Sequence, residues 1–212
     1  MVETDVTIES VREVGVGTVA LELRTPEGFD ALPGQFVKLT ARPDDEEVTR
    51  YYTLSSPYVE ETFELTVGVD PDGDLSPWLA ARDPGETVRI EGPHGRVTYD
   101  GEGDVVTVAG GPGIGPAVAI AEAAREAGHG AVVVYQDDHP AHEDRLASLE
   151  EENVPVSVVD EGDDERLTAV IADHLDDGQF YVFGFADFVE FVADAIDDAG
   201  GDADDALIEN FG

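Results

Sequence analysis

The chain has 212 residues, and its 49 acidic side chains outnumber its 11 basic ones to give a formal net charge of −38. A surface of that sign repels nucleic acid and anionic lipid, so we expect neither as a partner. The absence of cysteine excludes disulfide frameworks, zinc knuckles and iron–sulfur clusters held by thiolates. Because 42% of the residues are hydrophobic and fall in clear runs, we expect a folded chain of one large or two small domains.

The acidic residues are spread along the whole chain, and Lys38 is the only lysine. Such a composition resembles that of proteins from salt-accumulating haloarchaea. At molar salt the Debye length is only about 3 Å, so the repulsion between carboxylates is largely screened. The alternative is an acidic protein of ordinary cytosol with a basic partner. No apolar stretch approaches the roughly 20 residues that span a bilayer, and no signal-peptide pattern opens the chain, so we expect a soluble cytoplasmic protein.

The first hundred residues show short strand patterns separated by Pro and Gly turns. Alternating or β-branched runs predict strands at Val6–Ile8, Val19–Leu23, Phe36–Leu39 and Phe63–Val67. A short helix is predicted near Pro77–Ala81. This spacing is typical of an antiparallel β-barrel.

Beyond Gly101 strands alternate with helices, which predicts an α/β domain with a parallel sheet and helices on both faces. The predicted strands are Val105–Ala109, Ala131–Tyr135, Val156–Val159 and Phe180–Phe183. The predicted helices are Pro116–Ala127, His142–Glu151, Leu167–Leu175 and Phe188–Ala199. We therefore expect two domains, residues 1–100 and 101–212, with a ligand between them.

A glycine-rich turn, Gly110-Gly111-Pro112-Gly113-Ile114-Gly115-Pro116, follows a predicted strand and opens a helix. Glycines there allow a phosphate to approach the backbone, and a helix N-terminus offers free N–H groups. Pro116 fits the first helical position. The turn predicts a dinucleotide pyrophosphate or ribose site, and a tight turn without a ligand is the alternative.

A second candidate anion site is Gly73-Asp74-Leu75-Ser76-Pro77-Trp78-Leu79. Ser76 is the predicted N-cap of the short helix, and Pro77 its first residue. The charge of Asp74 would oppose a phosphate, so an ordinary capped helix is the alternative.

The third candidate, Arg50-Tyr51-Tyr52-Thr53-Leu54-Ser55-Ser56, combines an arginine, two aromatic rings and three hydroxyls. Arginine can clamp a pyrophosphate through paired hydrogen bonds, and a tyrosine can lie against a flat ring. The alternative is an amphipathic strand with Tyr52 and Leu54 inward and Arg50 on the surface.

Taken in order, these segments resemble the ferredoxin–NADP reductase superfamily of flavoproteins over nearly the whole chain. Arg50, Tyr52, Thr53 and Ser56 match the R-x-Y-[ST]-x-x-S flavin motif of that family. Gly73–Leu79 is similar to its second flavin-phosphate segment, and Gly111–Pro116 to its G-x-G-x-x-P nicotinamide segment. Pro33-Gly34-Gln35-Phe36 and Gly92-Pro93-His94-Gly95 resemble two of its structural turns.

The resemblance implies an NAD(P)H-dependent flavoprotein oxidoreductase that carries FAD and passes electrons to a separate acceptor, such as a ferredoxin or an oxygenase component. It implies that Arg50 binds the flavin pyrophosphate, that Tyr52 packs on the isoalloxazine, and that Thr53 lies close to flavin N5 with Ser56 in support. Phe211, near the end of the chain, would shield the ring until nicotinamide displaces it, the alternative being a frayed apolar terminus. Tyr52, Thr53 and Ser56 are thus the expected catalytic residues. The full expected cofactor-binding set is Arg50, Tyr51, Tyr52, Thr53, Leu54, Ser56, Val67, Gly68, Val69, Gly73, Leu75, Ser76, Gly111, Gly113, Ile114, Gly115, Pro116, Asp137, Gly184 and Phe211.

Three departures from the family pattern keep other functions open. Many relatives have Thr in place of Pro112 and Ala in place of Gly115, and relatives often carry Cys-Gly-Pro where this chain has Phe183-Gly184-Phe185. One alternative is a flavin-binding electron-transfer or regulatory subunit that turns over nicotinamide poorly. Another is a diaphorase that reduces free flavins or quinones.

Two further expectations concern the nicotinamide and metals. Asp137 can accept a hydrogen bond from a ribose 2′-hydroxyl but repels a 2′-phosphate, which favours NADH over NADPH. The five histidines include His139 and His142, three positions apart with no thiol to join them, so we expect solvated surface histidines and no metal site.

Overall fold

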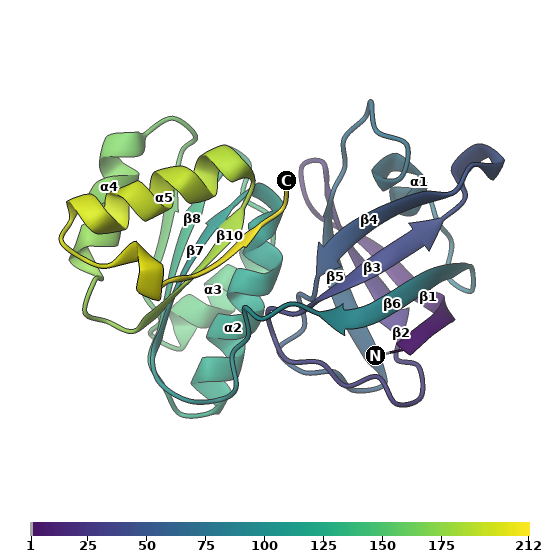
Figure 1. Ribbon diagram of the computed structural model, residues 1–212, viewed down its shortest axis with the longest axis horizontal. Helices are drawn as coiled ribbons and strands as arrows, with labels where there is room; N and C mark the ends of the chain where they lie inside the picture. Colours follow the sequence, from purple (N-terminus) through teal and green to yellow (C-terminus); the bar gives the residue numbers. More distant parts are fainter. Residues whose placement is uncertain (1) are drawn as a thin grey trace.

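The computed structural model describes residues 2–212, apart from the side chain of Asp45. Two lobes lie side by side, one built on an antiparallel sheet and the other on a parallel sheet (Figure 1). The first sheet contains β1 (Val2–Gly15), β2 (Thr18–Arg24), β3 (Phe36–Ala41), β4 (Val48–Thr53), β5 (Thr62–Gly68) and β6 (Thr87–His94). A 3₁₀ turn, η1 (Pro43–Asp45), joins β3 to β4, and the short helix α1 (Ser76–Ala80) follows β5.

The first sheet curls into a barrel because its two outer strands meet. Its strand order is β4-β3-β6-β1-β2-β5 with antiparallel pairing, and a bridge between Leu54 and Leu65 links the ends. The backbone N–H of Ser55 also donates to the carbonyl of Glu64, at 2.8 Å. Alternate residues of each strand therefore point into one apolar core, which includes Ile8, Leu21, Leu39, Leu54, Leu65 and Ile90.

The second sheet is parallel, with the order β11-β10-β7-β8-β9. Its strands are β7 (Val105–Gly110), β8 (Ala131–Gln136), β9 (Val156–Val159), β10 (Gln179–Gly184) and β11 (Leu207–Asn210). The connecting elements are η2 (Gly111–Gly113), α2 (Ile114–Glu126), α3 (Glu143–Glu151), α4 (Asp164–Asp173), α5 (Ala186–Asp198) and η3 (Ala203–Asp205). Helices α2 and α3 cover one face and α4 and α5 the other, each over its own apolar cluster.

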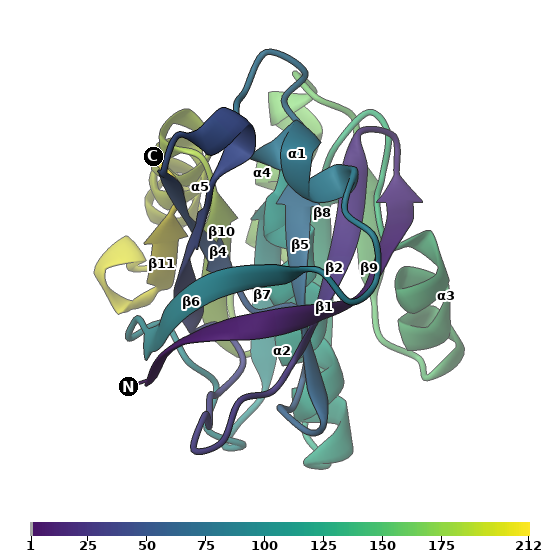
Figure 2. The same ribbon diagram turned by 90° about the vertical axis from the view of Figure 1, so that its right-hand side faces the viewer.

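The strand order of the second sheet reverses between β7 and β10. In open α/β sheets, ligands bind beyond the carboxyl ends of the strands at such a switch point. Here those ends are Gly110 and Gly184, and the chain after each turns toward the barrel lobe. The C-terminus lies at the junction of the two lobes (Figure 1), and Figure 2 gives the view from the barrel side.

The two-part fold class predicted from the sequence is confirmed, and every predicted strand and helix is present, most with shifted ends. The prediction missed β6 and β11, and it offered β4 only as an alternative interpretation of the segment that begins at Arg50. Gly92, Pro93 and His94, interpreted as part of a turn, lie inside β6, where Gly92 pairs with β1 and His94 with β3. The division at residues 100 and 101 stays a prediction, and Val97 and Tyr99 already pack in the core of the second sheet.

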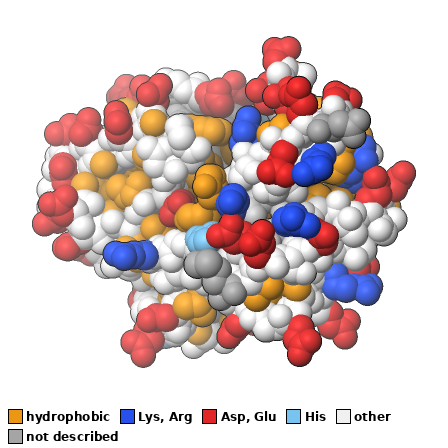
Figure 3. Space-filling model, turned by 45° about the vertical axis from the view of Figure 1, so that its right-hand side comes forward, with side chains coloured by type: hydrophobic (Ala, Val, Ile, Leu, Met, Phe, Trp, Pro, Cys, Tyr) orange, Lys and Arg blue, Asp and Glu red, His pale blue; other side chains and the backbone are white. Residues whose placement is uncertain are grey.

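Charge is unevenly divided between the lobes. Eight of the 11 basic residues fall in the first 100 positions. Acidic side chains are scattered around the outline of the face in Figure 3, while most basic ones gather on its right-hand part. Among residues 2–212, no helix combines the length and apolar character needed to cross a membrane.

Candidate functional site

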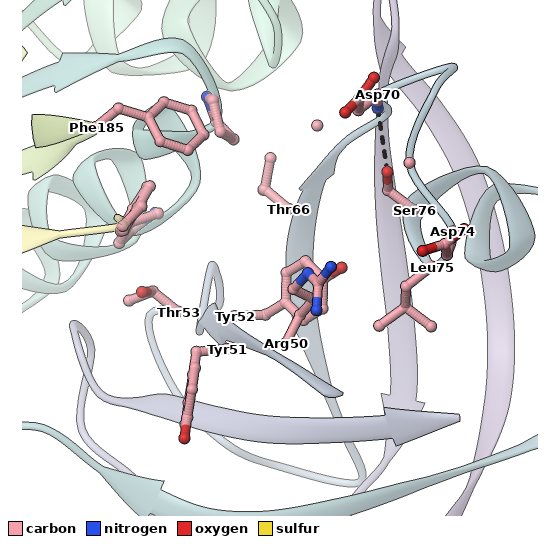
Figure 4. Close-up of a pocket in the computed structure, with 15 residues that line it drawn as sticks. Arg50, Tyr51, Tyr52, Thr53, Thr66, Asp70, Asp74, Leu75, Ser76 and Phe185 are labelled. Carbon is pink, nitrogen blue, oxygen red and sulfur yellow. Dashed lines mark hydrogen bonds between the residues drawn. The ribbon is translucent and has the colours of Figure 1, made fainter. Parts of the chain in front are cut away.

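A cavity of about 250 Å³ lies between the barrel and the carboxyl edge of the second sheet. Figure 4 draws the residues that line it. The barrel side contributes Arg50, Tyr51, Tyr52, Thr53, Thr66, Gly68, Asp70, Gly73, Asp74, Leu75 and Ser76. The second lobe contributes Pro112, Pro116, Phe185 and Phe211. All three motifs found in the sequence thus contribute residues to one cavity, two of them from the barrel and the glycine-rich turn from the second lobe.

Arg50 is the only arginine or lysine that lines this cavity. It lies on β4, and its Nη1 donates to the carbonyl of Thr49 at 2.8 Å. No described carboxylate forms an ion pair with it, although seven of the other basic residues do form such pairs. A guanidinium left without an acidic partner in so acidic a chain is a ready partner for an external anion.

The three residues after Arg50 differ in exposure. Tyr52 is half-buried against the barrel core, and burial raises the pKa of its phenol to about 12, so the hydroxyl stays protonated and can donate. Thr53 is buried at the end of β4. Tyr51 is 66% exposed, packs edge-on against Phe36 with ring centroids 5.7 Å apart, and extends away from the other labelled side chains (Figure 4).

The segment around α1 differs from its predicted form. Leu75, and not Ser76, is the N-cap, and the Ser76 hydroxyl accepts a hydrogen bond from the backbone N–H of Asp70 at 3.1 Å. The helix has only five residues, and Asp70 and Asp74 both border the cavity beside it. Because the dipole of so short a helix is small and two carboxylates oppose an anion, a phosphate site at α1 is not supported.

The glycine-rich turn is explained by contact between parts of the protein. A Cβ at Gly113 would lie 2.2 Å from the carbonyl oxygen of Phe183, and one at Gly115 would lie 2.3 Å from Oγ1 of Thr66. Both glycines are buried and neither lines the cavity, so a phosphate in the cavity could not approach the backbone at these two residues. Pro116 is the third residue of α2, not the first, but it still lies in the first turn, where a missing N–H costs no helical bond.

The end of the chain is anchored beside the cavity. The N–H of Phe211 donates to the carbonyl of Gly184 at 2.9 Å, which continues the pairing of β11 with β10. Phe211 and Phe185 both line the cavity, and Phe185 is 54% exposed. The alternative of a frayed terminus is therefore wrong. A Cβ at Gly184 would lie 2.5 Å from Cδ1 of Phe188, so close packing accounts for this glycine.

Ten residues of the predicted cofactor-binding set line the cavity: Arg50, Tyr51, Tyr52, Thr53, Gly68, Gly73, Leu75, Ser76, Pro116 and Phe211. Ten others do not: Leu54, Ser56, Val67, Val69, Gly111, Gly113, Ile114, Gly115, Asp137 and Gly184. Leu54, Val67 and Ile114 are fully buried core residues. The Ser56 hydroxyl accepts from the N–H of Glu64 at 2.7 Å and serves the barrel wall.

Asp137 follows β8, away from the cavity. Its carboxylate accepts from the hydroxyl of Tyr135 at 2.9 Å and from the N–H of His139 at 2.7 Å. These bonds hold the turn after β8 and leave other lone pairs of the carboxylate for a ribose hydroxyl.

Sequence reasoning missed a polar contact that joins the lobes. Thr66 on β5 lines the cavity, and its Oγ1 lies 2.8 Å from Nε2 of His142. His142 is 4% exposed, so the expectation of a solvated surface histidine is wrong for it. Burial lowers its pKa to about 3, and nearby Arg145 and Arg12 add to this effect. Within residues 2–212 no cluster of three potential metal ligands is found.

Comparison with known proteins identifies the barrel lobe. Residues 5–99 match the family described as the oxidoreductase FAD-binding domain. The chain is 38% identical over 96 residues to the glycine betaine monooxygenase reductase subunit of Chromohalobacter salexigens, covering 43% of this chain and 26% of that protein. A flavohemoprotein of a Burkholderia species is 30% identical over 141 residues, covering 59% of this chain and 35% of its own length. The chain thus spans about a quarter to a third of these two relatives.

Solved structures share the fold of the two lobes together. A ferredoxin NADP+ reductase from Neisseria gonorrhoeae with bound FAD and NADP has a TM-score of 0.81 at 20% identity, with 99% of both chains covered. The flavohem-like FAD/NAD-binding domain of nitric oxide dioxygenase from Vibrio cholerae also has a TM-score of 0.81, at 21% identity with 98% of both chains covered. The fold is therefore that of ferredoxin reductase-type FAD/NAD-binding oxidoreductases, and the resemblance found in the sequence is confirmed.

Proposed function

We propose that the protein is an FAD-dependent NAD(P)H oxidoreductase that passes electrons to a separate acceptor. The observation that carries this proposal is the cavity itself, in which the free guanidinium of Arg50, the phenol of Tyr52 and the ring of Phe211 face one space between the flavin domain and the second lobe. FAD, when bound there, would accept a hydride from a nicotinamide and release electrons to the acceptor.

The residues fit such a cofactor in chemical type. FAD has a doubly charged pyrophosphate and a flat ring system. Arg50 supplies the only positive charge that lines the cavity and binds the pyrophosphate. Tyr52 packs against the ring and donates its hydroxyl to the ribityl chain, while Thr53 offers a hydroxyl near the reacting edge. The aromatic residues Phe185 and Phe211 exclude water from the opposite side.

The nicotinamide nucleotide approaches along the carboxyl edge of the second sheet. The switch point between β7 and β10 opens onto the same cavity through Pro112 and Pro116. NADH is the preferred donor, because Asp137 stands at the end of β8 and repels a 2′-phosphate. The site of the nicotinamide ring is the space that Phe211 borders.

The acceptor is a ferredoxin or the oxygenase component of a multicomponent enzyme. Residues 1–212 contain no cysteine to hold an iron–sulfur cluster, so the electrons leave the flavin for another centre. We further propose that the protein works in the cytoplasm of a salt-accumulating cell, where its acidic surface stays hydrated and screened.

An anaerobic titration with NADH and then NADPH, in molar KCl and with FAD present, tests this function. Bleaching of the flavin absorbance by one equivalent of NADH within seconds is the expected result. A bound flavin that dithionite bleaches but neither nucleotide does would contradict the reductase function. That outcome would favour an electron-transfer subunit, an alternative motivated by Pro112 and by Phe183, whose buried ring lies where relatives often carry a cysteine.

A further inference from the structure

A buried hydrogen bond connects the barrel lobe to the second lobe beside the cavity. It joins Oγ1 of Thr66 on β5 to Nε2 of His142, 2.8 Å apart, and the two residues are 5% and 4% exposed. Neither residue belongs to the three sequence motifs. The hydroxyl and the imidazole are both buried, and each serves as the hydrogen-bond partner of the other.

The backbone of His142 is fixed on both sides. Its N–H donates to the carbonyl of Val14 on β1 at 2.8 Å, and its carbonyl accepts from the N–H of Leu146 in α3 at 3.0 Å. The residue has a positive φ of 56°, a region that asparagine and histidine tolerate better than most side chains. The ring therefore projects from a rigid turn.

Helix α3, which begins after this turn, makes a second contact with β5. Arg145 donates to Glu64 at 3.2 Å and, through two nitrogens, to Glu122 of α2 at 2.6 and 2.8 Å. Glu64 and Thr66 are two positions apart and thus lie on one face of β5. His142 at the N-cap of α3 and Arg145 in its first turn consequently contact two neighbouring residues of β5, which fixes where the imidazole meets Thr66.

Thr66 has little freedom on its remaining sides. The backbone of Gly115 in α2 lies against it so closely that a Cβ there would come 2.3 Å from Oγ1 and 2.6 Å from Cβ of Thr66. The other accessible space is the cavity, which Thr66 lines between Tyr52 and Phe185 in the view of Figure 4. Thr66 thus lies between the imidazole and the cavity.

We propose that His142 is a positioning residue that fixes the hydroxyl of Thr66 as a second flavin-contacting hydroxyl beside Thr53. This inference rests on the proposed function. A threonine hydroxyl has one donor and two acceptor positions, and a neutral imidazole nitrogen takes one of these roles. Two of the three positions remain, and with the hydroxyl held by the imidazole we infer that one of them is directed at the cavity. Because burial keeps the pKa of His142 near 3, the imidazole stays neutral at working pH.

A double-mutant cycle on FAD affinity tests the coupling, with Thr66→Val to remove the hydroxyl and His142→Asn to shorten the partner. Asparagine suits the positive φ but reaches only as far as Nδ1 of the imidazole, whereas His142→Gln reaches as far as Nε2 and serves as the matched rescue. Thr66→Val and His142→Asn should each weaken FAD binding about three- to tenfold, and the double variant should be no weaker than either. His142→Gln should restore most of the affinity.

The flavin midpoint potential of the same variants, measured against a reference dye, separates positioning from a structural role. We expect Thr66→Val and His142→Asn to shift the potential in the same direction and by a similar amount, and His142→Gln to leave it near the wild-type value. Far-UV circular dichroism identifies any variant that fails to fold. If Thr66→Val does not fold, Thr66→Ser replaces it. Because serine keeps the hydroxyl, Thr66→Ser should bind FAD as the wild type does.

Additive losses of affinity, or an unchanged potential in His142→Asn, would overturn the inference while the wild-type chain still binds FAD. A wild-type chain that binds no FAD would overturn the proposed function and this inference with it.

Discussion

Phe185 and Phe211 meet edge to face beside the cavity, with ring centroids 6.0 Å apart and planes at 88°. Phe185 follows β10 and Phe211 follows β11, and parallel pairing of these strands brings the two rings together. Edge-to-face pairs contribute about 0.5–1.5 kcal/mol beyond their buried area. A nicotinamide that takes the place of Phe211 therefore has to break this contact.

Removing the terminal ring should favour the nicotinamide. Phe211→Ala is expected to lower the KM for NADH about two- to tenfold, because no aromatic contact is lost when the nucleotide enters. Stopped-flow reduction of the flavin over a range of NADH concentrations measures the effect. Tyr58→Ala, at an exposed aromatic outside the cavity, is the control and should change nothing. A higher KM in Phe211→Ala would show that the ring helps to bind the nucleotide.

Arg50 should carry much of the affinity for FAD. Replacing it by glutamine removes the only cation that lines the cavity, and a charge-assisted bidentate contact is worth about 1.5–3 kcal/mol. FAD should therefore bind Arg50→Gln about 10- to 100-fold more weakly, as measured by fluorescence quenching. Arg166→Gln, an exposed arginine of α4, should bind as wild type does. Equal affinities of the two variants would exclude Arg50 from pyrophosphate binding.

Buried His142 should make the folded state sensitive to acid. The pKa of its imidazole is lowered from 6.5 to about 3 in the folded state. Below pH 6.5 the imidazole therefore binds a proton in the unfolded chain but not in the folded chain. The contribution of the neutral imidazole to the free energy of unfolding is thus fully present above pH 6.5, and it is lost as the pH falls toward 3. Between pH 7 and pH 5 the wild type should lose about 2 kcal/mol more unfolding free energy than His142→Gln. Urea unfolding in molar KCl at both pH values measures this, and parallel losses in the two proteins would show that the imidazole is protonated in place.

The sequence was informative where the signal is local. The strand containing Arg50, Tyr52 and Thr53 has its motif in consecutive residues, so its place at the cavity could be predicted. The pairing of Thr66 with His142 could not, because 76 positions separate them and only the docking of the two lobes brings them together. A threonine inside the apolar run of β5 was the one available signal.

Glycines illustrate a second limit. Gly113 and Gly115 stand in a turn that fits a phosphate site, yet each is needed because Phe183 or Thr66 fills the space of a Cβ. The sequence shows that a side chain is missing but not which neighbour excludes it. Strand β11 was missed for a related reason, since its four residues form a strand through pairing with β10 rather than through their own pattern.

The acidic surface predicts dependence on salt. At molar KCl the Debye length is about 3 Å, so repulsion among the 49 carboxylates is largely screened, whereas at 10 mM it acts over about 30 Å. The midpoint of thermal unfolding should rise markedly from low salt to molar KCl. Equal midpoints in both solutions would contradict the halophilic interpretation and favour a basic partner.

Titration of the purified, flavin-free chain with FAD in molar KCl tests the central claim most directly. The account predicts saturable binding of one FAD per chain, with quenched flavin fluorescence and shifted absorbance bands, and an affinity that falls in Arg50→Gln. FAD whose fluorescence and absorbance stay those of the free cofactor at every protein concentration would contradict it.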